Sequence, residues 1–366
     1  MPVRVAAIGK AATAMALGAH DAIGPAIEHT LIITRDAEDL SAFPARASPE
    51  VLLSAHPVPD ERSLAAGARL LSWVEELPAA AHPLFLVSGG SSSLVEVLEP
   101  GKTLRDLEEF TRAALASGIA IGELNARRAA LSRIKGGRLA ERLAGRAARA
   151  LFVSDVPHDD PRVIGSGLMG PAPAGADRIE REIVASVDHA VAGVAARAME
   201  LGLTVHAPSG RFADSATRLA ARFARELRLS SAQLCVWGGE STVQLPPHPG
   251  SGGRNQHLAL AAARRIAGHA DLLLLAAGTD GSDGVTADAG ALVDGETCAR
   301  LAIAELDAGR CLQRADSGRA LAASGDLVHT GPTGTNVGDL VIGLKLSAEE
   351  AAAVARRHGG VRGRAL

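Results

Sequence analysis

Three carboxylates lie in one glycine-rich loop that directly follows a short apolar run. The run is Leu272 to Ala276, and Asp280, Asp283 and Asp288 come after it. Such a run is typical of a buried strand in a parallel sheet, and ligands of open α/β sheets bind at the carboxyl ends of the strands. The acidic residues lack the spacing of an EF-hand, so the loop is suited to hold Mg²⁺ through one or two carboxylates beside water and phosphate oxygens. The alternative is an ordinary solvated turn.

Basic residues stand at positions suited to bind an anion. Lys10 falls at a predicted strand-to-helix junction, where its ammonium adds to the positive end of the helix dipole. Lys135 is one of only four lysines and precedes two glycines, so it is a compact point charge suited to phosphate. Arg254 and Asn255 follow PPHPGSGG and begin a predicted helix, where Arg254 is placed for a bidentate grip on a carboxylate or phosphate. For Lys10 and Arg254, a solvated residue at a helix start is the alternative.

A polar loop follows the predicted strand HPLFLV. Its glycines let the backbone approach a ligand, and its hydroxyls and the helix that begins nearby are suited to a phosphate or carboxylate cradle. An ordinary surface loop is the alternative. The loop residues are Ser88, Gly89, Gly90, Ser91 and Ser92.

Further polar residues stand near the ends of other predicted strands. Asp155 follows the strand ARALFV and is a better metal candidate than the acidic residues of the proline-flanked turn after it. Glu240 follows QLCVWGG, and Thr279 ends the apolar stretch before the acidic loop. Asn336 lies in the last polar loop, TGPTGTNVGD, before a closing strand.

The alternation of strand-like runs with alanine-rich helical stretches predicts an α/β enzyme. With 366 residues the chain is long enough for two domains, each with its own core. The stretch 177–202 is predicted as one long amphipathic helix. The domain boundary is placed after it, near residue 200 and no later than about residue 232.

Composition excludes several classes of protein. A net charge of -3 gives no basic surface for nucleic acid, and aromatic residues are only 2% of the chain, which removes the platforms on which bases stack. No apolar run is long enough for a membrane helix and no signal-peptide core is present, so we expect a cytoplasmic protein. Three cysteines without CxxC spacing support neither a disulfide framework nor a zinc site.

The sequence has neither a dinucleotide-binding motif in the right context nor a serine-hydrolase motif. Gly165 to Gly170 match GxGxxG, but Pro171 and Pro173 follow, so no helix opens there as a dinucleotide site requires. The serine-hydrolase motif GxSxG is absent. The repeated pattern of glycine with Ser, Thr, Asp, Lys or Arg at strand ends favours phosphoryl transfer, which needs backbone donors, cations, a metal and a group that orients the attacking hydroxyl.

The chain resembles the MOFRL-type glycerate kinases, also called glycerate 2-kinases. The motifs that carry the resemblance span nearly the whole chain: IGKAATAM, SAHPVPDERS, LVSGGSSSL, LNARRAALSRIKGGRLA, VSDVPHDD, GGESTV followed by GSGGRNQ, LAAGTDGSDGVTADAGA and TGPTGTNVGD. The resemblance implies a Rossmann-like α/β domain with a mostly parallel sheet over residues 1–200, a smaller MOFRL-type α/β domain over 201–366, and an active site in the cleft. It also implies Mg²⁺-dependent transfer of phosphate from ATP to the 2-hydroxyl of D-glycerate, which gives 2-phosphoglycerate.

The resemblance extends to individual residues. It implies that Lys10 and Arg254 grip the substrate, that Lys135 contacts phosphate and that the loop 88–92 is part of the cradle. Candidate ligands of the metal, near the reacting hydroxyl, are Asp155, Glu240, Asp280 and Asp283. Further substrate or phosphate contacts are expected from Asn255, Thr279 and Asn336. The sequence departs from the family pattern at SGGSSSL, for SGGGSAL, and in the stretch 158–173. The second change predicts an altered substrate pocket.

Two other functions stay open at this point. An NAD(P)H-dependent hydroxypyruvate reductase, a name that the resembling family often carries, would need a dinucleotide site. A non-catalytic protein that binds a sugar acid or a nucleotide on the same fold is the second, although such a protein has no need of metal-handling carboxylates. The expected partners are glycerate and ATP, with a monomer or a homodimer as the assembly.

Overall fold

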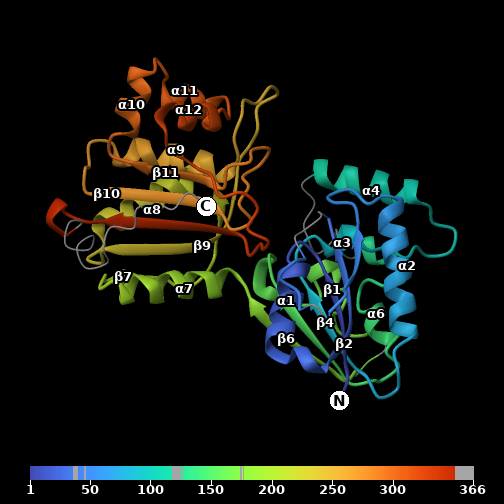
Figure 1. The fold of residues 1–366 in the computed structure, drawn as a ribbon. Coiled ribbons are helices and arrows are strands. Elements are labelled where there is room, and N and C mark those ends of the chain that lie inside the picture. The colour runs from blue at the N-terminus through green and yellow to red at the C-terminus, as the bar shows by residue number, and fades with distance from the viewer. Residues whose placement is uncertain are drawn as a thin grey trace. The chain divides into compact units, whose positions relative to one another are not determined.

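The computed structural model describes residues 1–35, 40–44, 47–117, 125, 127–173, 175 and 177–350. They form two compact units. The first comprises residues 1–186 with the tripeptide 334–336, and the second comprises residues 187–333 with the chain from residue 337 on. Each unit has its own sheet and its own hydrophobic cores (Figure 1).

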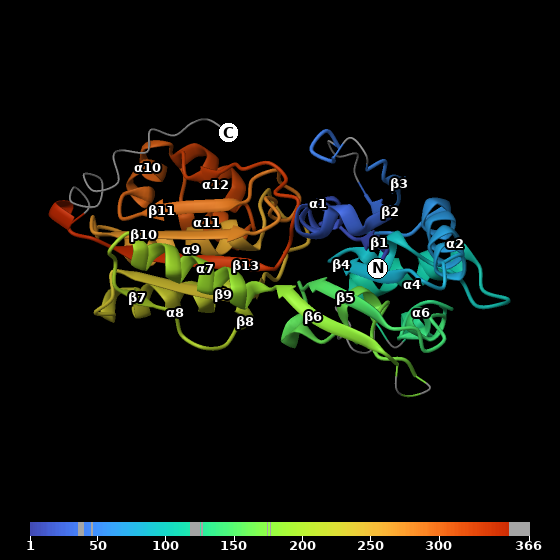
Figure 2. The same cartoon turned by 60° about the horizontal axis from the view of Figure 1, so that its bottom comes forward.

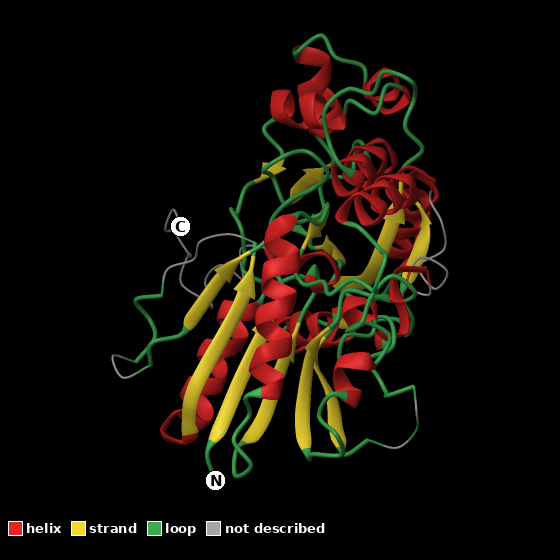
Figure 3. Cartoon of the chain, turned by 90° about the vertical axis from the view of Figure 1, so that its right-hand side faces the viewer, coloured by secondary structure: helices red, strands yellow, loops and turns green. Residues whose placement is uncertain are grey.

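The first unit is built on a six-stranded sheet. Its strands are β1 (Val3–Ile8), β2 (Ile27–Thr34), β3 (Glu50–Leu53), β4 (His82–Val87), β5 (Ala148–Val153) and β6 (Ile179–Ala185). The order is β3-β2-β1-β4-β5-β6, so β3 and β6 form the two edges (Figure 2). Every pairing along this order is parallel, and the arrows accordingly point the same way in Figure 3. The predicted Rossmann-like domain with a parallel sheet is confirmed.

Helices pack on both faces of this sheet. Figure 1 shows α1 (Ala12–Ile23) on one face and α2 (Glu61–Glu75) on the other. Helix α1 packs against β1, and α2 buries Leu70 and Trp73 in the core on its side of the sheet. The chain enters α2 through a capping box, because Asp60 accepts a hydrogen bond from the first turn and its own N–H donates to Ser63 Oγ at 3.2 Å. The other helical segments are α3 (Ser91–Leu94), α4 (Leu104–Ser117), α6 (Arg138–Glu141), η1 (Gly24–Ala26), η2 (Pro157–Asp159) and η3 (Ile164–Ser166).

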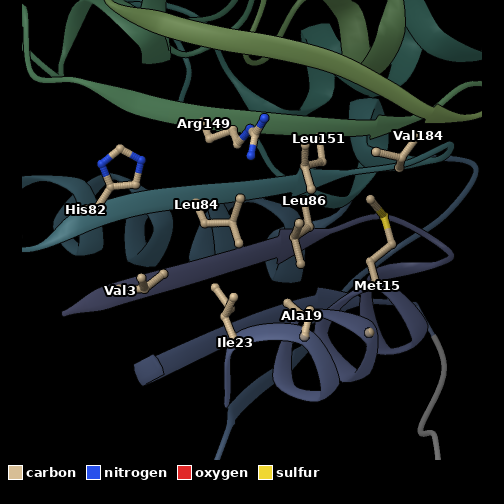
Figure 4. A pocket seen from close by; sticks show the side chains of 12 residues that line it. Val3, Met15, Ala19, Ile23, His82, Leu84, Leu86, Arg149, Leu151 and Val184 are labelled. Carbon is tan, nitrogen blue, oxygen red and sulfur yellow. The ribbon is translucent and has the colours of Figure 1, made fainter. Parts of the chain in front are cut away.

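An apolar pocket of about 460 Å³ lies beside α1, over strands β1, β4, β5 and β6 (Figure 4). Met15, Leu86 and Leu151 line it, and His82 and Arg149 supply polar groups. None of the sequence-predicted site residues lines this pocket. The pocket is therefore separate from the predicted site residues.

The second unit has a mixed sheet. Its strands are β7 (Val205–His206), β8 (Phe212–Ser215), β9 (Leu234–Thr242), β10 (Leu272–Gly278), β11 (Gly290–Asp294), β12 (Leu327–Val328) and β13 (Asp339–Lys345). The order is β12-β11-β10-β13-β9-β7, and β8 also pairs with β9. Strand β10 is antiparallel to both β11 and β13, so its interpretation as a strand of a parallel sheet was wrong. A continuous apolar run indicates burial and carries no information on the direction of the neighbouring strands.

Helices again lie on both faces of the second sheet. On one face α7 (Val187–Glu200) packs on β9, and on the other α8 (Ala216–Leu229) and α9 (Arg254–Ile266) share one core. Buried side chains recur every four residues along α8, as an amphipathic helix requires. The remaining helices are α10 (Thr297–Ile303), α11 (Ala308–Gln313) and α12 (Ser317–Ser324). Of the helices that the structure describes, none is long and apolar enough to cross a bilayer.

The two compact units divide between Ser186 and Val187, within the stretch 177–202 that precedes the predicted domain boundary. The stretch 177–202, predicted as one helix, forms strand β6 followed by α7. Burial alternates along β6, whereas Ala195 and Ala198 of α7 join a core of the second unit. Helix α7 therefore belongs to the second unit.

Candidate active site

In the first unit, three neighbouring parallel strands bring predicted site residues together at their carboxyl ends. Lys10, Ser88 and Asp155 follow β1, β4 and β5. The Lys10 N–H donates to the Gly89 carbonyl at 2.9 Å, and the Ala11 N–H donates to Ser88 Oγ at 3.0 Å. These hydrogen bonds fix the start of α1 against the loop after β4.

Two glycines allow the loops at these strand ends to approach one another. Gly9 has a φ of +130°, and a Cβ there would lie 2.2 Å from Ser88 Oγ. A Cβ on Gly89 would lie 2.1 Å from Oδ2 of Asp155. Neither position has room for a side chain, so the glycines serve the close approach that the loop needs.

Other predicted residues surround the same loop. A Cβ on Gly90 would lie 3.2 Å from Cγ of Lys10 and 3.1 Å from Cδ2 of His56. Asn336, in the tripeptide grouped with the first unit, donates from Nδ2 to Oδ2 of Asp155 at 3.3 Å. The structure thus brings together Lys10, Asp155 and Asn336, which come from distant parts of the sequence.

The two serines that follow Gly90 differ in their surroundings. Ser91 is fully buried, and its Oγ has no hydrogen-bond partner in the part of the chain that the structure describes. Oγ of Ser92 lies 2.9 Å from Oγ of Ser166. The Ser166 hydroxyl also bonds Oδ1 of Asn125 at 2.9 Å and accepts from Nη1 of Arg128 at 3.4 Å. A polar network therefore supports the end of the cradle.

Sequence reasoning missed the roles of Ser166 and Arg128 in this network. Ser166 lies in GSGLMG, which the sequence analysis weighed only as a dinucleotide motif. The available signal was a serine between two glycines in a turn, a place where the backbone often adopts positive φ. Ser166 does so, with φ +58°.

Lys135 lies in a different environment from the one expected. Its side chain is fully buried, and Nζ lies 2.5 Å from Oε2 of Glu96, which is also fully buried. Burial lowers the pKa of Lys135, and the Glu96 carboxylate opposes that shift. The N–H groups of the next two residues, Gly136 and Gly137, donate to the turn at residues 166 and 167. Lys135 and its glycines thus support the Ser166 turn, and its predicted phosphate contact is not favoured by this burial.

In the second unit, strand β13 contributes a further acidic residue at the edge of the sheet where β9 and β10 end. Strand β13 is antiparallel to β9 and β10, so its amino end lies beside their carboxyl ends. Its first residue, Asp339, pairs with Gly239 of β9 and with Gly278 of β10. Sequence reasoning overlooked Asp339 because it considered only the carboxyl ends of strands assumed to be parallel.

Asp339 holds the predicted substrate-binding arginine. Nε and Nη2 of Arg254 donate to its two carboxylate oxygens at 2.7 and 3.1 Å, and Nη1 donates to Glu240. Burial opposes the charge on Arg254, but Asp339 and Glu240 outweigh it and raise the arginine pKa. Burial also raises the pKa of Asp339, against the effect of Arg254. The guanidinium is therefore permanently charged and fixed in direction.

Asp283 caps the helix that begins at Arg254. Its carboxylate accepts hydrogen bonds from the N–H groups of Asn255 at 3.1 Å and Gln256 at 2.7 Å, the free donors of the first turn of α9. Burial raises the pKa of Asp283 to about 6, although these amides and Arg254 oppose the shift. Oδ1 of Asn255 is buried without a hydrogen-bond partner among the described residues.

Thr279 and Asp280 lie in a loop that is tied to the start of β13. Thr279 Oγ1 donates to the Gly338 carbonyl at 2.7 Å and accepts from the Val337 N–H at 2.9 Å. Oδ1 of Asp280 accepts from the N–H of Ser282 at 3.1 Å and from its hydroxyl at 3.0 Å. The loop is thereby held in one shape, with the Asp280 carboxylate on its partly exposed side.

The carboxylates expected to bind metal are not equivalent. Within the described ranges, no group of three or more His, Cys, Asp or Glu side chains is arranged to hold an ion. Glu240 pairs with Arg254, and Asp283 caps α9. Asp155 and Asp280 stay candidates, and one or two carboxylates suffice for an Mg²⁺ ion that takes its other ligands from water and phosphate.

Known proteins share both halves of this arrangement. A domain of unknown function, DUF4147, matches residues 1–198, and the MOFRL family matches residues 233–339. The D-glycerate 2-kinase of Thermotoga maritima is 34% identical over 93% of this chain and 90% of its own length. The crystal structure of glycerate kinase from Thermotoga maritima aligns with a TM-score of 0.85 at 33% identity, covering 94% of this chain and 91% of that chain. The chain belongs to the MOFRL-type glycerate kinase family.

This MOFRL-type kinase carries its candidate residues in both matched regions. The DUF4147 match includes Lys10 and the loop 88–92, and the MOFRL match includes Arg254, Asp280 and Asp339. A putative hydroxypyruvate reductase from Agrobacterium vitis is 36% identical over 92% of the chain and 85% of its own length. Proteins of that name therefore share the sequence pattern, and the chemistry of the site has to distinguish the two activities.

Proposed function

We propose that this chain transfers the terminal phosphoryl group of ATP to the 2-hydroxyl of D-glycerate and so forms 2-phosphoglycerate. The observation that carries the proposal is the convergence of Lys10, the backbone of loop 88–92 and Asp155 at the ends of three parallel strands. Such a cradle of backbone donors with one cation suits an anionic substrate. The names of the relatives supply glycerate as the acceptor.

Phosphoryl transfer asks the protein for charge and position. Negative charge spreads over the oxygens of the transferring group, and preorganised cations lower the energy of that state. In the proposal, Lys10 and Arg254 supply this charge, and Asn255 presents its buried amide oxygen to the substrate or its metal. Asp280 orients the attacking hydroxyl and accepts its proton.

Mg²⁺ fits the oxygen donors that are present. Asp280 lies in a partly exposed loop, and Asp155 lies beside the cradle. In the proposal, either of them can supply a hard carboxylate ligand. A bound Mg²⁺ would supply positive charge that neutralises part of the charge on the phosphate oxygens. Glu240 and Asp283 are not included, because each already has a partner in the protein.

A coupled assay tests this function. Purified protein is given D-glycerate and ATP, and ADP formation is followed with Mg²⁺ and again with excess chelator. We expect ADP to form only when glycerate, ATP and Mg²⁺ are all present. Equal ADP formation without glycerate would show that the protein only hydrolyses ATP, and this would contradict the proposal.

The same preparation tests the reductase alternative with NADH and hydroxypyruvate. The GxGxxG stretch that this alternative would need forms the short turn Ile164–Ser166, with positive φ at Gly165, Ser166 and Gly167. A dinucleotide fingerprint instead connects a strand to a helix whose amino end meets the pyrophosphate. We therefore expect no oxidation of NADH, and steady oxidation with hydroxypyruvate would favour the reductase.

A further inference from the structure

Two carboxylates hold the Arg254 guanidinium, and their surroundings differ. The Asp339 side chain is only 2% exposed and takes the edge formed by Nε and Nη2. The Glu240 side chain is 54% exposed and takes Nη1. The buried Asp339 therefore holds the Nε and Nη2 edge of the guanidinium, and the exposed Glu240 holds Nη1.

The two acids also differ in freedom of movement. Asp339 is the first residue of β13, with a strand on either side of it, so its carboxylate has a short side chain on a fixed backbone. Glu240 lies near the end of β9 and has a longer side chain with more rotamers. An exposed ion pair is weak, whereas a buried carboxylate that loses its cation is left uncompensated at high cost. Glu240 can therefore leave Arg254 far more easily than Asp339 can.

We propose that Asp339 is the positioning residue of Arg254, and that Glu240 occupies the guanidinium edge that an anionic group of the substrate takes. The inference rests on the proposed function of Arg254 as a substrate-binding cation. When the anion binds, it replaces Glu240 at Nη1, and Asp339 keeps the guanidinium in place. The two acids consequently have opposite effects on the affinity for the anion, although both contact the same side chain.

Steady-state kinetics of two isosteric variants test this difference. Asp339→Asn should lower kcat/KM about tenfold to a hundredfold, the range found for groups that orient the ligands of a metal ion and taken here for an oriented arginine. Glu240→Gln should lower KM about twofold to fivefold and keep kcat, because it removes a competitor of modest strength. A higher KM in Glu240→Gln would contradict the proposal that the substrate anion replaces the Glu240 carboxylate at Arg254.

The matched control is Asp326→Asn. Asp326 is also a buried acid of the second unit, 8% exposed, and it accepts from Nη2 of Arg300 at 2.5 Å. Its loss should lower stability and leave kcat and KM at their wild-type values. If Asp326→Asn lowered kcat/KM as much as Asp339→Asn, the effect would be structural, and the positioning role would fall.

A double-mutant cycle separates positioning from an independent contribution. If Asp339 acts through Arg254, the variant Arg254→Ala with Asp339→Asn should match Arg254→Ala alone within about twofold. Multiplicative losses in the double variant would contradict the inference.

A readout that needs no turnover keeps the inference distinct from the proposed function. The Nε–H resonance of Arg254, identified by its disappearance in Arg254→Lys, should persist in Glu240→Gln and be lost to exchange in Asp339→Asn. Titration with inorganic phosphate should move this resonance at about twofold to fivefold lower concentration in Glu240→Gln. These results would hold even if glycerate were not the acceptor, whereas an unchanged resonance in Asp339→Asn would overturn the inference by itself.

Discussion

Lys10 and Lys135 both stand beside glycines in the sequence, yet they have different environments. Lys10 lies next to the cradle loop, where a Cβ on Gly90 would meet its Cγ. Lys135 is fully buried with Glu96. Neither burial nor the identity of a distant ion-pair partner is encoded in the neighbouring residues, so the sequence predicted the same role for both lysines. In the structure Lys10 lies beside the cradle loop, whereas Lys135 supports the Ser166 turn.

Removal of the Lys10 ammonium should abolish most of the turnover without unfolding the protein. We expect Lys10→Ala to lose at least about a hundredfold in kcat, since one preorganised charge at a reacting centre is often worth about 3 kcal/mol. Lys102→Ala, at an exposed lysine of the same unit, is the matched control and should keep wild-type turnover. Near-normal kcat in Lys10→Ala would remove this residue from the mechanism.

The buried pair of Lys135 and Glu96 should behave as a structural unit. Lys135→Met leaves the Glu96 charge uncompensated and should lower the free energy of unfolding by about 3–5 kcal/mol. Replacement of both residues, as Lys135→Met with Glu96→Leu, should recover most of that loss. Denaturant unfolding measures both values, and a single variant as stable as the wild type would show that the pair does not stabilise the fold.

Among the elements, the junction of β1 and α1 depends on a glycine. Gly9→Ala should lower both stability and turnover, because its φ is +130° and the new Cβ would lie 2.2 Å from Ser88 Oγ. Gly18, in the interior of α1, is the matched control, since a Cβ there meets nothing within 4 Å. Gly18→Ala should raise stability by about 0.5–1 kcal/mol. Thermal unfolding measures the stability of both variants, and the kinase assay measures their turnover. Equal stability and turnover in Gly9→Ala and Gly18→Ala would contradict the need for glycine at position 9.

The cap on α9 gives a stability that depends on pH. The pKa of Asp283 is raised from 3.8 to about 6 in the folded protein, chiefly by burial. Between these values the folded state keeps a proton that the unfolded state has lost, so the contribution of Asp283 is largest below about pH 4 and falls as pH rises to about 6. The change amounts to about 3 kcal/mol.

Urea unfolding in chelator at several pH values measures this dependence. The wild-type free energy of unfolding should fall between pH 4 and 6 relative to Asp283→Asn, and the two curves should run parallel above about pH 6.5. Curves that run parallel over the whole range would show that Asp283 has an ordinary pKa.

At the scale of elements, the parallel sheet of the first unit was predictable from sequence because β1, β4 and β5, three neighbouring strands, are short apolar runs that end in polar loops. The direction of β10 relative to its neighbours was not predictable, because a buried strand is a continuous apolar run whether its neighbours are parallel or antiparallel. The stretch 177–202 was misread because IEREIVA and the helix after it are joined without a turn signal. Asp339 was missed for a related reason, because it lies at the amino end of an antiparallel strand.

Across the whole molecule, the candidate residues are divided between two units. The first carries Lys10, the loop 88–92 and Asp155, and the second carries Arg254, Asp280 and Asp339. Family models match residues of both regions, 1–198 and 233–339. Most of the motifs were recognisable from sequence because they place glycines and charged residues at a strand end. The hydrogen bonds that fix Arg254 and Ser166, in contrast, join residues distant in sequence.

Phosphorus NMR of the reaction product tests the proposed chemistry most directly. Purified protein is incubated with D-glycerate, ATP and Mg²⁺, and the coupling of the new phosphorus signal to carbon-bound protons identifies the phosphorylated oxygen. We predict a signal coupled to the single proton at carbon 2, as in 2-phosphoglycerate, with loss of the terminal phosphate of ATP. Coupling to the two protons at carbon 3 would contradict the predicted position, and intact ATP would contradict the kinase reaction with glycerate.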